Sequence, residues 1–274
     1  MTGRKGGLLG ALARMRGRDI ELKSPAEFEA MRAAGALVAA TLAAVRELAK
    51  PGVSTAELDA LAEQTIRDAG AVPSFKGYHG FPASICASVN DQIVHGIPSA
   101  GQVLADGDLI SVDCGAILEG WHGDSAVTLA IGEVSDGDLA LSAACEKAMW
   151  AGIEAAAPGA RLTDISHAIQ KACEAAAIAD RADYGIVAEY GGHGIGTSMH
   201  MDPFLPNHGE PGKGPRLVPG MALAIEPMLT AGDPETRELE DGWTVVTAHG
   251  GRAVHWEHTI AITDTGYRVL TLPA

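Results

Sequence analysis

The first pattern of apolar and polar positions along the chain has the period of an α-helix. Ser24-Pro25-Ala26-Glu27 combines an N-cap residue, a proline at the first helical position and a glutamate three residues after the cap. It predicts a helix that continues until Pro51-Gly52. A second capping box, Ser54 with Glu57, opens a helix that ends at Gly70.

The same order of elements returns in the second half of the chain. Helices are predicted over about residues 138–157 and 163–177, on either side of Pro158-Gly159. The apolar runs 107–113 and 220–226 each place an acid six residues after a glycine. We interpret this pattern as a duplicated helix-helix-strand unit within one domain, with a chance match of helix-stop signals as the alternative. Duplication would bring the two acids to a shared axis, so we expect an active site between the halves.

Residues 109–132 have the pattern of a β-hairpin with its turn near Glu119-Gly120. Asp113 and Asp124 lie on its two arms and are expected to be roughly opposite each other, with Cβ atoms ~4.5–5.5 Å apart. Two like charges this close require a shared proton, a basic partner or a cation. The alternative is a pair of surface acids beside a turn.

Two acids of the second half also end or begin apolar segments. Glu226 ends the run "MALAIE", and Glu257 follows Trp256 in a segment whose alternation predicts a half-buried strand. Acids in such places seldom lack partners. Together with Asp113 and Asp124 they carry four negative charges, which two divalent cations would neutralise. The pattern therefore indicates a dinuclear metal site, with the ions ~3.5–4 Å apart.

The glycine-rich stretch Glu189–Pro203, "EYGGHGIGTSMHMDP", admits two interpretations. A dinucleotide-binding fingerprint is excluded, because the spacing from Gly192 is G-x-G-x-G and no helical pattern follows. His193 and His200 are instead predicted to lie on an irregular loop whose glycines let the backbone pass close to another group. Beside the four acids, a metal-ligand role is favoured over a core or surface histidine.

Composition narrows the class of protein. The chain has 274 residues, of which 47% are hydrophobic, as in a globular enzyme with a substantial core. Its formal charge of −15 argues against broad binding to nucleic acid or anionic membranes. The four cysteines form no CxxC pair, which suits reduced thiols. The apolar stretch Leu8–Met15 is short and broken by Arg14, so no membrane contact and a cytoplasmic location are expected.

The N-terminal region breaks the acidic trend. Residues 1–23 hold six basic residues against two acidic ones, a net charge of +4. We interpret residues 1–19 as a loosely attached basic leader, with contact to an anionic partner such as ribosomal RNA as the alternative. Residues 20–274 are predicted to form one catalytic domain with two pseudo-repeats, approximately 24–135 and 136–272.

Several segments, in this order and spacing, resemble bacterial type I methionine aminopeptidases over about residues 20–272: "YHGFPASICASVNDQIVHGIP", "ISVDCG", "HGD", "GGHGIG", "AIEPM", "DGWTVVT" and "EHTIAIT". The resemblance implies an α+β pita-bread fold, a pseudo-two-fold antiparallel sheet with helices on one face. It also implies a monomer that removes the initiator methionine from nascent, deformylated proteins when the second residue is small. Two divalent ions, Mn²⁺, Fe²⁺ or Co²⁺, would activate the attacking water.

The resemblance also implies roles for individual residues. The metal ligands would be Asp113, Asp124, His193, Glu226 and Glu257. Glu226 would carry the proton, His200 would donate to the oxyanion, and His95 would contact the nitrogen of the departing residue. The substrate pocket would comprise, besides His95 and His200, the residues Tyr78, Phe81, Cys86, Met199 and Trp243. Phe75 and Met199 depart from the residue types common at their positions, which affects the shape of the pocket.

Three other interpretations fit the sequence less well. Pita-bread relatives that cleave Xaa-Pro bonds or hydrolyse creatine usually carry a large additional N-terminal domain, and "DGWTVVT" is typical of methionine aminopeptidases. A non-catalytic relative that binds ribosomes or RNA would have lost metal ligands. A metal-binding scaffold would explain the acids but not the complete set of histidines.

Overall fold

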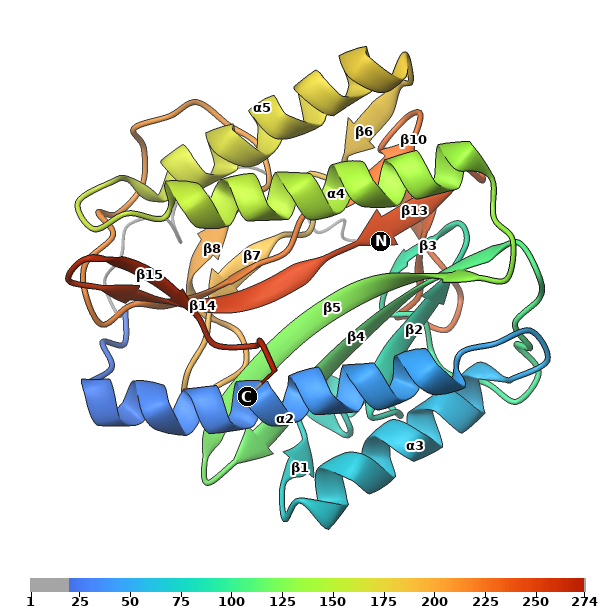
Figure 1. The fold of residues 1–274 in the computed structure, drawn as a ribbon, viewed down its shortest axis with the longest axis horizontal. Coiled ribbons are helices and arrows are strands. Elements are labelled where there is room, and N and C mark those ends of the chain that lie inside the picture. Colours follow the sequence, from blue (N-terminus) through green and yellow to red (C-terminus); the bar gives the residue numbers. More distant parts are fainter. Residues whose placement is uncertain (1–19, 274) are drawn as a thin grey trace, which may run out of the picture.

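The structure is a computed structural model and describes residues 20–273. It is an α+β fold built on an antiparallel sheet (Figure 1). Within the described residues this sheet has nine strands, in the order β1-β4-β5-β14-β9-β7-β8, with β2 beside β4 and β15 beside β14. Their bounds are β1 Val72–Pro73, β2 Ile85–Val89, β4 Asp108–Leu118, β5 Trp121–Ile131, β7 Gly192–Gly194, β8 Met201–Leu205, β9 Ala222–Ile225, β14 Glu257–Thr263 and β15 Gly266–Val269.

Two small sheets flank the large one. The first comprises β13 (Ala253–His255), β10 (Met228–Ala231) and β6 (Tyr184–Ile186). The second comprises β11 (Thr236–Glu238), β12 (Val245–Thr247) and β3 (Gln92–Val94). A 3-10 turn, η1 (Tyr78–Gly80), precedes β2.

The two helices of the first half begin where their caps predict. In α2 (Pro25–Leu48) and α3 (Thr55–Asp68), the backbone N–H of the capping serine donates to the glutamate three residues on, at 2.7 Å and 2.8 Å. These two predictions are confirmed. Helix α4 (Asp136–Ala155) begins two residues earlier than expected, because Ser135 is its N-cap. Helix α5 (Leu162–Asp180) extends beyond the predicted end.

The helices form two pairs on one side of the large sheet (Figure 1). Helices α2 and α3 share a hydrophobic core with β2, β4 and β5, and α4 and α5 share another with β9 and β14. The two parts of the sheet join where β5 pairs with β14, Ala126 opposite Glu257. The division into repeats 24–135 and 136–272 stays a prediction, and the basic leader 1–19 lies outside the described residues.

Helix α2 is long and apolar enough, by length and composition, to cross a membrane, with a mean hydropathy of 1.4. Eight of its residues are buried, and it packs on β4 and β5. Its Gly35 lies against Gly123 of β5 so closely that a Cβ on Gly123 would be 2.8 Å from the Gly35 Cα. A core helix of a folded domain passes the same test of composition, and this close packing identifies α2 as one.

Candidate active site

One cavity of about 390 Å³ is lined by all twelve residues that the resemblance assigns to the metal site and the substrate pocket. It lies on the sheet face away from the helices: Val112 and Cys114 of β4 point into the helix-covered core, so Asp113 between them points to the other face. We call one side of the cavity the acidic cluster, formed by Asp113, Asp124, His193, Glu226 and Glu257. The other side is the apolar pocket, formed by Phe75, Tyr78, Phe81, Cys86, Met199 and Trp243.

The predicted hairpin is present, but its register differs from the expectation. Asp113 pairs with Ala126, and Asp124 pairs with Gly115. The two aspartates were predicted to be roughly opposite each other and are instead offset by two residues, because the turn is centred between Glu119 and Gly120, both with positive φ (52° and 85°). Moving the centre by one residue moves every pairing by two. The aspartates are therefore diagonal neighbours on one face, still within reach of a common ligand.

His193 lies in a short strand, contrary to the prediction of a loop. It is the central residue of β7 and pairs with Ala224 of β9. Its flanking glycines make room for the neighbouring strands: a Cβ on Gly192 would overlap the Ala224 carbonyl, and one on Gly194 would overlap the Asp202 carbonyl. His200 does lie in an irregular segment, directly before β8.

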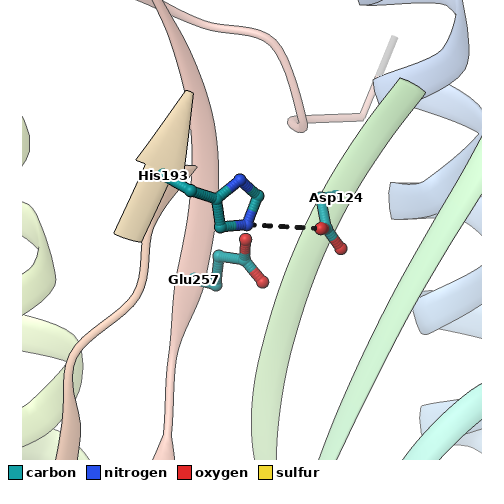
Figure 2. A group of neighbouring side chains, drawn as sticks. All are labelled: Asp124, His193 and Glu257. Atoms are coloured by element: carbon teal, nitrogen blue, oxygen red, sulfur yellow. Dashed lines mark ion pairs between the residues drawn. The ribbon is translucent and has the colours of Figure 1, made fainter. Parts of the chain in front are cut away.

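Asp124, His193 and Glu257 converge, as Figure 2 shows. Each offers a ligand atom, and these atoms lie within 4.8 Å of one another. His193 Nε2 is 3.9 Å from Asp124 Oδ2 and 3.4 Å from Glu226 Oε1. Because His193 Nδ1 is 2.9 Å from the Gly194 carbonyl, Nδ1 carries the proton and Nε2 turns its lone pair to the acids.

The carboxylates of the acidic cluster are buried without enough positive charge or hydrogen-bond donors around them to stabilise their ionised forms. Burial raises the pKa of Asp113 to about 7 and the pKa values of Asp124, Glu226 and Glu257 well above their usual range. Burial also lowers the pKa of His193 to about 3. Asp113 Oδ1, Asp124 Oδ1 and Glu257 Oε1 are buried without a hydrogen-bond partner. Such atoms require a proton or a cation, so this set of oxygen donors and one imidazole nitrogen fits divalent metal ions.

The apolar pocket adjoins the cluster, since Cys86 of β2 pairs with Asp113 of β4. Phe75, Phe81, Cys86 and Met199 are buried, and the rings of Phe81 and Trp243 meet edge to face, with centroids 5.1 Å apart. Asp241 fixes the Trp243 backbone by accepting its N–H at 2.9 Å. Aromatic edges and sulfur atoms suit an unbranched, polarizable side chain.

Two further histidines of the predicted site, His95 and His200, also line the cavity. His200 Nδ1 is 3.0 Å from the Tyr78 hydroxyl. His95 has φ of 59°, a conformation uncommon outside glycine, and it faces Trp243 edge-on at 6.4 Å. The backbone of Gly96 holds it there, donating to Ser88 Oγ at 3.1 Å and accepting from Ala87 N–H at 2.9 Å. Burial lowers the pKa of His95 to about 4, so its ring is neutral at physiological pH.

His255 also lines the cavity, although it was not among the predicted site residues. Its side chain is buried, and its Nε2 lies 3.5 Å from Glu226 Oε2. His255 precedes Glu257 by two residues, and the strand alternation already used for Glu257 places i and i+2 on one face. That spacing was the available signal. His79 also lines the cavity and was not singled out.

With this geometry in place, comparison with known proteins defines the class of enzyme. Residues 29–264 match the model of metallopeptidase family M24, and the chain belongs to that family. It is therefore a metallopeptidase, a hydrolase, and its α+β architecture is the pita-bread fold.

Individual relatives make the class narrower. The chain is 59% identical over 262 residues to methionine aminopeptidase 1 of Mycobacterium tuberculosis (strain CDC 1551 / Oshkosh), covering 95% of this chain and 98% of the relative. It is 51% identical to methionine aminopeptidase 1 of Bacillus subtilis (strain 168), covering 91% and 98%. The crystal structure of methionine aminopeptidase from Thermotoga maritima superposes with a TM-score of 0.89 at 40% identity, covering 92% and 99%. The resemblance read from the sequence motifs is confirmed.

Proposed function

We propose that this chain removes the N-terminal methionine from polypeptides by hydrolysing the first peptide bond. The observation that carries the proposal is the cavity itself, in which buried carboxylates without partners adjoin an apolar pocket of aromatic and sulfur-bearing side chains. The relatives named methionine aminopeptidase support the same activity.

Two divalent ions, Mn²⁺, Fe²⁺ or Co²⁺, would be held by Asp113, Asp124, His193, Glu226 and Glu257. Four ionised carboxylates carry the charge that two such ions compensate. When bound, the ions lower the pKa of a water and polarise the scissile carbonyl. The ligand roles of the five residues are part of this proposal.

The protein's own groups handle the protons. Glu226 accepts a proton from the attacking water and passes it to the leaving nitrogen. We assign the Tyr78 hydroxyl as the donor to His200 Nδ1, 3.0 Å away, which leaves the proton of His200 on Nε2. That N–H donates to the oxygen of the tetrahedral intermediate. His95, neutral and with its backbone fixed by Gly96, contacts the nitrogen of the departing residue.

The apolar pocket selects methionine. Tyr78, Phe81, Cys86, Met199 and Trp243 surround an unbranched thioether and offer no charge to a polar side chain. The substrate presents a free α-amine beside Asp113, so a formyl group has to be removed first. A small second residue is the preferred one.

The substrates would be the N-termini of nascent polypeptides in the cytoplasm, acted on by a monomer. Contact with the ribosome is proposed for the basic leader, whose residues 1–19 lie outside the described part of the chain.

The test uses metal-free protein titrated with Mn²⁺, Fe²⁺ or Co²⁺. We expect release of methionine from Met-Ala-Ser, little release from Met-Lys-Ser, and no cleavage of an Ala-Pro dipeptide. Asp113→Ala and Glu226→Ala, as matched variants, should abolish the release. Absence of cleavage with every metal, or cleavage of the Ala-Pro dipeptide alone, would contradict the proposal.

A further inference from the structure

The segment before α2 contacts the active-site loop. We call residues 20–23 the strap and residues 195–200 the site loop. At one end of the strap, the Lys23 N–H donates at 2.7 Å to the carbonyl of Gly220, two residues before β9. Beside it, the Glu21 carboxylate accepts the Thr197 hydroxyl at 2.5 Å and the Thr197 N–H at 3.3 Å. The strap therefore bridges β9 and the site loop.

The site loop carries two residues of the proposed site, Met199 of the apolar pocket and His200. Residues 195–200 belong to no helix or strand and connect β7 to β8. On the side of the sheet, the Gly196 carbonyl accepts the His122 N–H of β5 at 3.0 Å. Thr197 and Ser198 are exposed, so core packing does not hold this part of the loop. Ile195 and Met199 are buried on either side of this exposed part, and Glu21 accepts two of the hydrogen bonds that hold Thr197 between them.

Lys23 is packed under the loop in an unusual state for a lysine. Its side chain is 2% exposed, and its Nζ lies 3.3 Å from Glu21 Oε1 and donates to the Glu21 carbonyl at 3.3 Å. A buried ammonium is costly unless it is paired, so the ion pair with Glu21 holds both side chains in place.

The loop and the strap are in close contact at Gly196. A Cβ at this position would overlap the Glu21 carboxylate and would lie 2.7 Å from Lys23 Nζ. The contact therefore permits only glycine while the ion pair is in place.

We propose that Glu21 and Lys23 are positioning residues: the strap fixes the site loop and thereby sets Met199 against the substrate side chain and His200 against the reacting carbonyl. The kinetic part of this inference rests on the proposed function. Glu21 and Lys23 precede the family motifs in the sequence and belong to none of them.

The kinetic test compares Glu21→Gln and Lys23→Met with Glu29→Gln. The control removes an ion pair with Arg268 from the first turns of α2 without touching the site loop. For Met-Ala-Ser we expect KM to rise about 3–10-fold in the two strap variants, because a hydrogen bond to a charged group is lost or misplaced. A loss of folded enzyme would lower the apparent kcat but leave KM unchanged. A wild-type KM in both strap variants would overturn the positioning role.

Two further variants approach the contact from the loop. Thr197→Val removes the hydroxyl and should raise KM, and Thr197→Ser, which keeps it, should restore KM. Gly196→Ala should displace the ion pair and raise KM as well. An equal KM for Thr197→Val and wild type would count against the strap.

Hydrogen exchange separates this inference from the proposed function. Amides of residues 195–200 should exchange faster in Glu21→Gln than in wild type, and at the wild-type rate in Glu29→Gln. If the wild-type protein releases no methionine, the proposed function fails and the exchange rates alone decide whether the strap holds the loop. Unchanged exchange in Glu21→Gln would then refute it.

Discussion

The two sides of the cavity are built from different parts of the fold. In the acidic cluster, Asp113, Asp124, His193 and Glu257 lie within β4, β5, β7 and β14, and Glu226 directly follows β9. In the apolar pocket, only Cys86 lies in a strand, whereas Tyr78 belongs to a 3-10 turn and Phe75, Phe81, Met199 and Trp243 lie between elements. The proposed metal ligands, which need fixed geometry, lie in or next to strands of the large sheet, and most residues proposed to select the substrate lie on connecting segments. Substitutions on the two sides should therefore have different kinetic signatures.

The largest effect is expected in the acidic cluster. Asp124→Asn and Glu257→Gln each replace a carboxylate by a neutral amide at the point where three side chains converge. Activity should fall by more than the ~10–100-fold typical of losing an outer-shell partner. Metal content, measured by mass spectrometry of the purified variants, should fall with it. Wild-type metal content and activity in either variant would remove that residue from the proposed ligands.

The apolar side should respond in KM. Trp243→Ala removes the ring that meets Phe81 edge to face and opens the pocket. We expect KM for Met-Ala-Ser to rise at least about tenfold, because burial of a methionine side chain contributes ~1.5–3 kcal/mol. Steady-state kinetics with measured metal content checks this, and the metal content should stay at the wild-type level. A loss of metal would show that the two sides are not independent.

Tyr78 belongs to the apolar pocket and contacts His200. Its substitution should have a smaller effect than that of Trp243. Tyr78→Phe keeps the ring in the pocket but removes the hydroxyl that faces His200 Nδ1. We expect kcat to fall by about three- to tenfold with little change in KM, since one hydrogen bond contributes about 1 kcal/mol. The pH profile of kcat should shift at the same time. A change confined to KM would place the role of Tyr78 in binding.

The smallest expected effect is the pH dependence of the stability of the metal-free protein. Burial raises the folded-state pKa of Asp113 to about 7, so its stabilising contribution is complete below its unfolded pKa of ~3.9 and is lost as pH rises through about 7. Asp124, Glu226 and Glu257, whose pKa values are also raised, act in the same direction. The buried histidines oppose this only below about pH 6.5, because burial lowers their pKa values.

Above that pH the acids dominate. The Tm of chelator-treated protein should fall between pH 6.5 and 8.5, and saturating Mn²⁺ should reduce the fall. Calorimetry at the two pH values measures both. A Tm of the metal-free protein that is independent of pH would contradict the electrostatic account of the cluster.

Local signals predicted much of the fold. Ser24 with Glu27 and Ser54 with Glu57 set the starts of α2 and α3, because a capping box is decided within four residues. The hairpin followed from its alternation and from Glu119-Gly120. The four acids were found from the predicted hairpin and from the ends of apolar segments, and the glycine-rich stretch pointed to His193 and His200. The family motifs added His95 and the pocket.

Non-local pairing explains the errors. The register of β4 and β5 depends on which residues of the turn take positive φ, and the chain midpoint between Asp113 and Asp124 does not reveal that. Strand β7 has three residues, two of them glycine, and exists because β8 and β9 pair with it. Such a strand has no periodic signal of its own. The contact between Glu21 and Thr197 joins residues 176 positions apart and was equally invisible in the sequence.

The most direct measurement is a crystal structure of the protein loaded with Mn²⁺, with the ions located by anomalous scattering. The account predicts two manganese peaks, both among Asp113, Asp124, His193, Glu226 and Glu257. Absence of manganese from these five side chains, in crystals grown at saturating Mn²⁺, would contradict it.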